Sequence, residues 1–145
     1  MPAPRLRGAA PAGWRRVLAA LVLGSAVTGP ALAQDLRVTR SVESGVPSVV
    51  AHERSWDRDC RTLPVSVTVT RAPAHGTVTM EHASSVIPAS TPRMGSTGRC
   101  AGKPVTGEQI AYRAHPGFRG TDTLAYSVAY GGGRSGSTTI TIDVR

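Results

Sequence analysis

Asparagine is absent from this chain of 145 residues, lysine occurs once (Lys103) and phenylalanine occurs once (Phe118). Sixteen of the 17 basic residues are therefore arginine, which indicates a bias in coding composition before it indicates a phosphate-binding surface. The arginines are scattered along the sequence, without a run of like charges and without interleaved aromatic residues. A nucleic-acid partner is not expected from this pattern.

Sequence motifs of the common catalytic and metal sites are missing as well. There is no Cys-x-x-Cys pair, no Gly-x-Ser-x-Gly nucleophile elbow and no nucleotide-binding glycine loop. A zinc site needs three or four converging ligands, and no pair of histidines has the i, i+2 or i, i+4 spacing that would begin one. The histidines are interpreted as solvated surface residues: His52, His75, His82 and His115. The sequence predicts a protein that is not an enzyme and that has no cofactor and no metal site.

Residues 1–33 are predicted to form a secretory signal peptide. The segment begins with four arginines and no acid, continues into an apolar run at 17–27, and ends at the small-x-small sequence Ala31-Leu32-Ala33. Eleven apolar residues are too few for a membrane-spanning helix, which needs about 20. Cleavage before Gln34 implies a periplasmic or extracellular protein. The pair Arg15-Arg16 leaves open whether export follows the twin-arginine route or the ordinary one.

Residues 34–145 form one predicted domain. Removal of the signal segment leaves 112 of the 145 residues, which is enough for a single hydrophobic core. Four of the 17 basic residues lie in the signal segment and all nine acidic residues follow it, so the mature net charge is +4. No transmembrane segment is expected in the mature chain.

The clearest structural signal lies in the C-terminal third of the chain. Ile110 and Tyr112 alternate with their neighbours along one run, and Leu124 and Tyr126 do the same along the next. Period-two alternation in adjacent runs predicts two strands, each with one buried face. The turn between the runs contains Gly120, which suits a backbone with positive φ.

The same pattern predicts five more strands, at 34–42, 48–52, 64–71, 77–82 and 137–144. Residues 53–63 are expected to form a polar loop from which Trp56 packs over an end of the core, and Met80 is expected to face inward. Seven strands with one apolar face each predict an all-β fold, an immunoglobulin-like antiparallel β-sandwich. One core is expected to contain Tyr112, Leu124, Tyr126, Ile140 and Ile142.

Three segments carry a family resemblance. They are Ala74-His75-Gly76-Thr77-Val78, the run Tyr112-Arg-Ala-His-Pro-Gly-Phe-Arg-Gly-Thr-Asp-Thr-Leu-Ala-Tyr126, and Thr139-Ile-Thr-Ile-Asp-Val144 after a glycine hairpin. Over residues 64–144 the chain resembles the cadherin-like, immunoglobulin-like repeat of bacterial surface and secreted proteins. The most specific part is the turn that contains Gly117, Phe118, Gly120 and Asp122. Leu124 stands where the family usually has phenylalanine, and Ala114 where it usually has proline.

The resemblance implies a fold and a type of module, and it does not imply a reaction. Members of the family often occur in tandem within long adhesive chains, whereas this chain carries one copy. The expected role is therefore a non-catalytic binding or structural module of the bacterial cell envelope, whose partner would be an envelope protein or glycan. The alternative is an enzyme-associated module, either an inhibitor or an accessory carbohydrate-binding domain, that uses the long irregular stretch at 83–104 as its contact surface.

The two cysteines, Cys60 and Cys100, are expected to form a disulfide. An exported chain meets an oxidising compartment, and two cysteines permit one pairing. The bond would hold the irregular stretch at 83–104, which is long for a segment without support.

Asp122 has two interpretations. Acids at strand ends bind calcium in calcium-dependent cadherins, and calcium takes several oxygen ligands that Asp57 and Asp59 would have to help supply. Alternatively, Asp122 accepts hydrogen bonds from backbone N–H groups of the turn that it closes. The second interpretation is favoured because it requires no further partner.

Overall fold

The computed structural model describes residues 34–145, so the predicted signal peptide lies outside the described residues. Ten strands and one short 3-10 helix follow one another: β1 Gln34–Val42, β2 Ser48–Trp56, β3 Thr62–Leu63, β4 Val65–Arg71, β5 Gly76–Val86, β6 Ser90–Thr91, β7 Gly95–Ser96, η1 Gly98–Cys100, β8 Pro104–Ala114, β9 Gly120–Tyr130 and β10 Arg134–Val144. The all-β prediction is confirmed for the part of the chain that is described.

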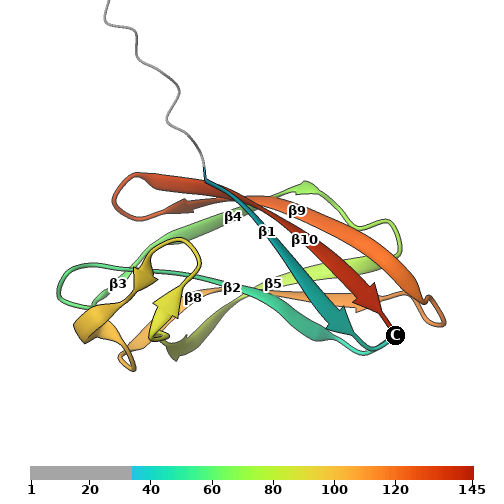
Figure 1. Cartoon of the computed structure of the whole chain (residues 1–145), viewed down its shortest axis with the longest axis horizontal. Helices are drawn as coiled ribbons and strands as arrows, with labels where there is room; N and C mark the ends of the chain where they lie inside the picture. The colour runs from blue at the N-terminus through green and yellow to red at the C-terminus, as the bar shows by residue number, and fades with distance from the viewer. Residues whose placement is uncertain (1–33) are drawn as a thin grey trace, which may run out of the picture. The chain divides into compact units, whose positions relative to one another are not determined.

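Two four-stranded sheets make up the domain. One has the order β1-β10-β9-β4 and the other β3-β2-β8-β5, while β6 and β7 form a separate two-stranded hairpin. Figure 1 shows the two sheets as two layers, with β9 and β10 in one layer and β2 and β8 in the other. Each sheet has one apolar face, and stacking the two faces removes both from water.

The sequence predicted that all neighbouring strands are antiparallel, and this prediction is wrong for one pair. β1 runs parallel to β10, with Val38 beside Ile140. A short link at 43–47 takes the chain from β1 into the other sheet, so β1 is not held in a hairpin and either direction is open to it. β1 pairs with β10 along its whole length, from Gln34 beside Gly136 to Val42 beside Val144.

The strands are longer than the hydrophobic pattern predicted. β2 continues to Trp56, β5 continues to Val86 and β8 begins at Pro104, so the polar loop expected at 53–63 is mostly strand and the long irregular stretch shrinks to 87–103. Backbone pairing explains the difference, because Glu53 lies opposite Glu108 and Arg54 opposite Gly107 in the β2–β8 ladder. A charged side chain does not prevent its backbone from joining a ladder.

The main core contains the five residues expected to share it. Eleven buried residues form it: Val42, Val50, Ile110, Tyr112, Ala114, Leu124, Tyr126, Val128, Ile140, Ile142 and Val144. Val78 of β5 packs against this cluster, but Met80 is 46% exposed, so its predicted inward position is wrong. β5 is the edge strand of its sheet, and an edge strand can be covered along only part of its length.

Gly107 in β8 is required by the close approach of β2. A Cβ atom at this position would lie 2.1 Å from the backbone oxygen of Glu53, an atom that cannot move without distorting the ladder. We therefore expect Gly107→Ala to lower the free energy of unfolding by about 1–3 kcal/mol, the usual cost of overpacking. Urea unfolding followed by circular dichroism measures the effect. Thr79→Ala, at an exposed site on β5, is the control, and an equal small loss in both variants would contradict the prediction.

Candidate functional site

The Asp122 turn fastens one end of the sandwich. Asp122 Oδ1 accepts hydrogen bonds from the backbone N–H groups of Ala74 (2.9 Å) and Thr123 (2.8 Å). Its Oδ2 accepts from the backbone N–H of His75 (2.8 Å) and from the Tyr112 hydroxyl (3.0 Å). A carboxylate has about four lone-pair positions, and these four donors fill them. The geometry is that of a carboxylate that caps a turn.

The surrounding turn explains why the sequence motif has its spacing. Gly117 and Gly120 have φ of 79° and 129°, in the region that favours glycine. The ring of Phe118 stacks on His75 with centroids 4.2 Å apart, and the His115 N–H donates to the His75 oxygen at 2.8 Å. The motif therefore joins the β8–β9 turn to the 72–75 turn before β5.

The charge state of Asp122 follows from these contacts. Burial acts to raise the pKa of Asp122, but the backbone N–H groups of Ala74, His75 and Thr123 and the Tyr112 hydroxyl together outweigh it and lower the pKa. The carboxylate is ionised at neutral pH. Within residues 34–145 no group of three or more His, Cys, Asp or Glu side chains is placed to hold a metal ion. Asp57 accepts from the backbone of Asp59 and Arg61 in its own turn.

Cys60 and Cys100 lie at bonding distance, with their sulfur atoms 2.05 Å apart. They join the β2–β3 turn to η1 at the end of the 87–103 segment. The bond packs beside a second buried cluster that contains Trp56, Ile87 and Val105. Trp56 thus anchors this cluster rather than an end of the main core.

The 87–103 segment, called here the cover loop, is held at several points besides the disulfide. The two ends of the loop are hydrogen-bonded to each other: Ile87 N donates to Lys103 O and Gly102 N donates to Ile87 O, both at 2.8 Å. Farther along, Arg93 Nη2 donates to the Ser137 oxygen and to Thr138 Oγ1, each at 2.7 Å. These bonds fix the loop to β10 of the opposite sheet.

A pocket of about 660 Å³ lies beneath the cover loop. Its walls come from β1, β2, β9, β10 and the loop itself. The lining side chains are apolar, aromatic, acidic and basic, and they include Leu36, Val38, Arg40, Val50, His52, Glu53, Arg54, Trp56, Pro88, Pro92, Arg93, Met94, Tyr126, Tyr130, Arg134 and Thr138. The volume lies within the range of about 300–1,000 Å³ typical of small-molecule sites. It is larger than the other pocket described in residues 34–145, which lies beside Asp122 and has a volume of about 170 Å³.

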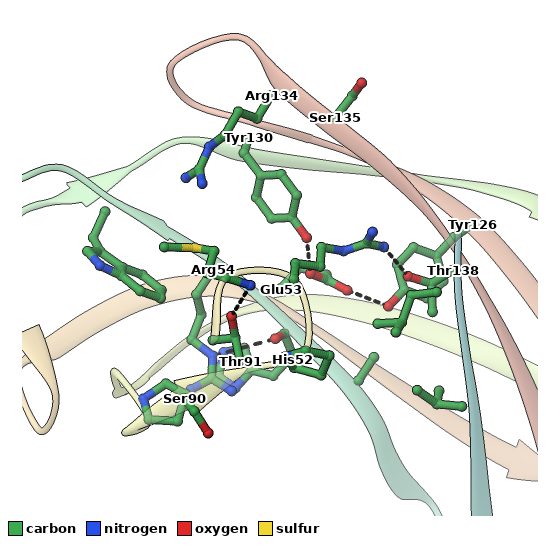
Figure 2. A pocket seen from close by; sticks show the side chains of 18 of the residues that line it. His52, Glu53, Arg54, Ser90, Thr91, Tyr126, Tyr130, Arg134, Ser135 and Thr138 are labelled. Carbon is green, nitrogen blue, oxygen red and sulfur yellow. Dashed lines mark hydrogen bonds between the residues drawn. The ribbon is translucent and has the colours of Figure 1, made fainter. Parts of the chain in front are cut away.

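Glu53 is the carboxylate at the centre of this pocket. Its Oε1 accepts a hydrogen bond from the Tyr126 hydroxyl and its Oε2 one from the Tyr130 hydroxyl, both at 2.5 Å. Figure 2 shows Glu53 between the two tyrosine rings, which reach it from the facing sheet. The three side chains therefore tie β2 to β9 across the floor of the pocket.

His52 also lines the pocket, and the expectation of a solvated surface histidine is wrong for this residue. Burial, and then the nearby Arg54 guanidinium, lower the pKa of His52, so its imidazole is neutral at pH 7. The other histidines lie elsewhere: His82 is exposed and contacts Glu108 at 3.1 Å, and His75 stacks in the Asp122 turn.

The three tyrosines of the chain all donate to carboxylates, which predicts an unusual alkaline titration. Burial, and then the neighbouring Asp122 or Glu53, raise the pKa of Tyr112, Tyr126 and Tyr130. A phenol whose pKa is raised by folding stabilises the fold fully below the unfolded pKa, about 10, and less as the pH rises above it. We expect phenolate absorbance to appear only together with loss of the β-sheet circular dichroism signal. Titration near pH 10 with the fold intact would contradict this.

The sequence indicated the Asp122 turn and the cysteine pair but not the pocket. The sequence predicts that Glu53 and Arg54 lie in the polar loop at 53–63 and that Tyr126 lies in the core, which gives no reason to bring them together. The interruption of the apolar face of β1 by Arg40 is the one available signal, since Arg40 lines the pocket together with Leu36 and Val38 of the same strand. The irregular stretch at 83–104 is a contact surface in the enzyme-associated alternative, but the sequence does not show which strands face it.

No helix among residues 34–145 has the length and apolar character needed to cross a bilayer. Comparisons with protein-family models, with curated proteins and with solved structures found no match.

Proposed function

We propose that the mature domain is a non-catalytic binding module exported to the bacterial cell envelope. Its sandwich is proposed to be of the immunoglobulin-like, cadherin-like type, on the basis of the segments that include Gly117, Phe118, Gly120 and Asp122. The observation that carries the proposal is the pocket under the cover loop, because ligand sites are concave and binding residues are often carried by loops on a rigid scaffold.

A purely structural module is the competing role. A spacer needs stable ends and a rigid core, and it has no use for a pocket of this volume lined by aromatic, acidic and basic side chains. The held loop and the pocket therefore favour binding over spacing. Binding as an inhibitor or as an accessory carbohydrate-binding domain would use the same surface.

Retention of an envelope component by the immobilised mature domain tests the proposal. We expect the domain to retain one protein or glycan from envelope extract at both low and high salt, since a mature charge of +4 attracts anionic polymers only where salt does not screen it. Met94→Asp on the cover loop should abolish retention, whereas Val46→Asp should not, because Met94 lines the pocket and Val46 does not. Both are exposed apolar side chains, 43% and 48% respectively.

Deletion of residues 90–97 is a second variant that removes the hairpin of the loop. Its folding is checked by thermal unfolding before use. Equal retention by wild type, Met94→Asp and the deletion variant would contradict a binding role for the pocket. Hydrolysis of an envelope polymer by the purified domain would overturn the non-catalytic assignment.

Export is tested by the mass of the mature protein. We expect protein recovered from the periplasm or the medium to begin at Gln34, because the small-x-small sequence Ala31-Leu32-Ala33 follows an apolar run. Intact-mass spectrometry of the recovered protein gives the answer directly. A mass that retains residues 1–33 would refute both the cleavage and the proposed location.

A further inference from the structure

The pocket under the cover loop carries an excess of positive charge. Four arginines line it (Arg40, Arg54, Arg93 and Arg134), against the single carboxylate of Glu53. Both oxygens of that carboxylate already accept tyrosine hydroxyls. An entering anion would therefore meet arginines on several walls and one acid whose oxygens face hydrogen-bond donors.

Arg54 lies part-buried in the wall of the pocket. Its Nη1 donates to the backbone oxygen of Val86 at 2.7 Å and its Nε to that of His52 at 3.5 Å. Burial lowers the pKa of Arg54, and the neighbouring Glu53 only partly offsets the effect. Its hydrogen-bond acceptors are neutral carbonyl oxygens rather than a carboxylate, so within residues 34–145 no ion pair neutralises this guanidinium.

Arg134 opens β10 at the rim of the same pocket. Its guanidinium makes no hydrogen bond and no ion pair with any residue of the described chain, 34–145. Figure 2 shows the side chain beside the ring of Tyr130, above Glu53. Arg134 is exposed, so its substitution should leave the fold intact.

Apolar and aromatic side chains form much of the remaining wall. Trp56, Val50 and Tyr130 come from the two sheets, and Pro92 and Met94 come from the cover loop. Flat rings and a flexible thioether are suited to contact with a planar apolar body. Guanidinium groups also stack on aromatic faces, which adds to that contact.

We propose that this pocket binds a small organic anion with an aromatic body, its acidic group lying at Arg134 and its rings against Trp56, Tyr130 and Met94. The inference rests on the proposed function, because it takes this pocket to be the surface through which the module binds. It adds the chemical class of the ligand: a carboxylate or sulfonate attached to an aromatic body.

Two dyes that share one aromatic body test the inference. 8-Anilino-1-naphthalenesulfonate carries an anionic group, and N-phenyl-1-naphthylamine is the same body without it. We expect the sulfonate to bind the oxidised mature domain at one saturable site, with an affinity about tenfold or more above that of the neutral dye, as a hydrogen-bonded charge pair provides. Fluorescence titration measures both affinities.

Arg134→Met removes the charge and keeps an apolar stem, and Arg119→Met makes the same change of net charge at an exposed site outside the pocket. Arg134→Met should lower the affinity for the sulfonate about tenfold and leave that for the neutral dye unchanged, while Arg119→Met should change neither. Near-UV circular dichroism and thermal unfolding establish that each variant is folded.

Equal affinities for the two dyes, or equal losses in Arg134→Met and Arg119→Met, would overturn the ligand class. If the domain still retained its envelope component in a Met94-dependent way, the proposed binding function would stand without this ligand class. If the dye preference and the Met94-dependent retention were both absent, the proposed binding function would be contradicted as well.

Discussion

Cys60→Ala is expected to lower the free energy of unfolding by about 2–5 kcal/mol and to lower the melting temperature strongly. The disulfide closes a loop with a sequence separation of 40 residues. In the chain-entropy model, closing a loop of that length restricts the unfolded chain by about 4 kcal/mol. Thermal and urea unfolding of the wild type and the variant measure the difference.

The position of Cys60 offers a matched control. Cys60 has a φ of 65°, in the left-handed region where a side chain is strained and glycine is not. Cys60→Gly should therefore lose about 1 kcal/mol less than Cys60→Ala, although both remove the same bond. Reduction of the wild type should reproduce most of the loss. A reduced wild type that melts at the temperature of the oxidised protein would contradict the prediction.

The same bond should govern the mobility of the cover loop. Its amides at Ile87, Thr97 and Gly102 are held by hydrogen bonds that close only within the loop and its ends. Hydrogen exchange at these three positions should accelerate on reduction, whereas exchange in the strands around Leu124 and Ile140 should change little. Such a pattern would separate local loosening of the pocket from global loss of stability.

The features predicted from the sequence are those set by local patterning. Alternation along residues such as Leu124 and Tyr126 fixed which faces are buried, and the glycines of the β8–β9 turn marked where the chain reverses. The parallel pairing of β1 with β10 was not predictable, because parallel and antiparallel edge strands have the same alternation. The ends of β2 and β5 were missed because backbone pairing continued past the apolar residues.

The pocket was hidden from the sequence for a related reason. It depends on residues from five separate segments, and only the sheet stacking brings Glu53 of β2 to Tyr126 and Tyr130 of β9. The glutamate fits the polar segment in which it occurs, and the two tyrosines fit the apolar face of their strand. Neither observation indicates that these side chains meet. Long-range register is what makes them a site, and a single sequence carries no direct measure of register.

The Asp122 turn gives the second large expected effect. Asp122→Ala should lower the free energy of unfolding by about 1–3 kcal/mol, because it leaves the backbone N–H groups of Ala74, His75 and Thr123 without an acceptor at a buried site. Thermal unfolding in the presence of calcium and of a chelator measures the loss. The capping interpretation requires the same loss in both conditions.

The dependence of stability on acidic pH should differ between the wild type and Asp122→Asn. Folding lowers the pKa of Asp122, through its hydrogen bonds and against the effect of burial, so its contribution to stability is complete above the unfolded value of about 3.9 and is lost as the pH falls toward the folded pKa. Wild type should therefore lose stability below about pH 4 more steeply than Asp122→Asn, whose amide does not titrate there. The asparagine should still be less stable than wild type at pH 7, because its NH₂ group faces N–H donors. A rise in the wild-type melting temperature with calcium that Asp122→Ala abolishes would instead establish Asp122 as a metal ligand.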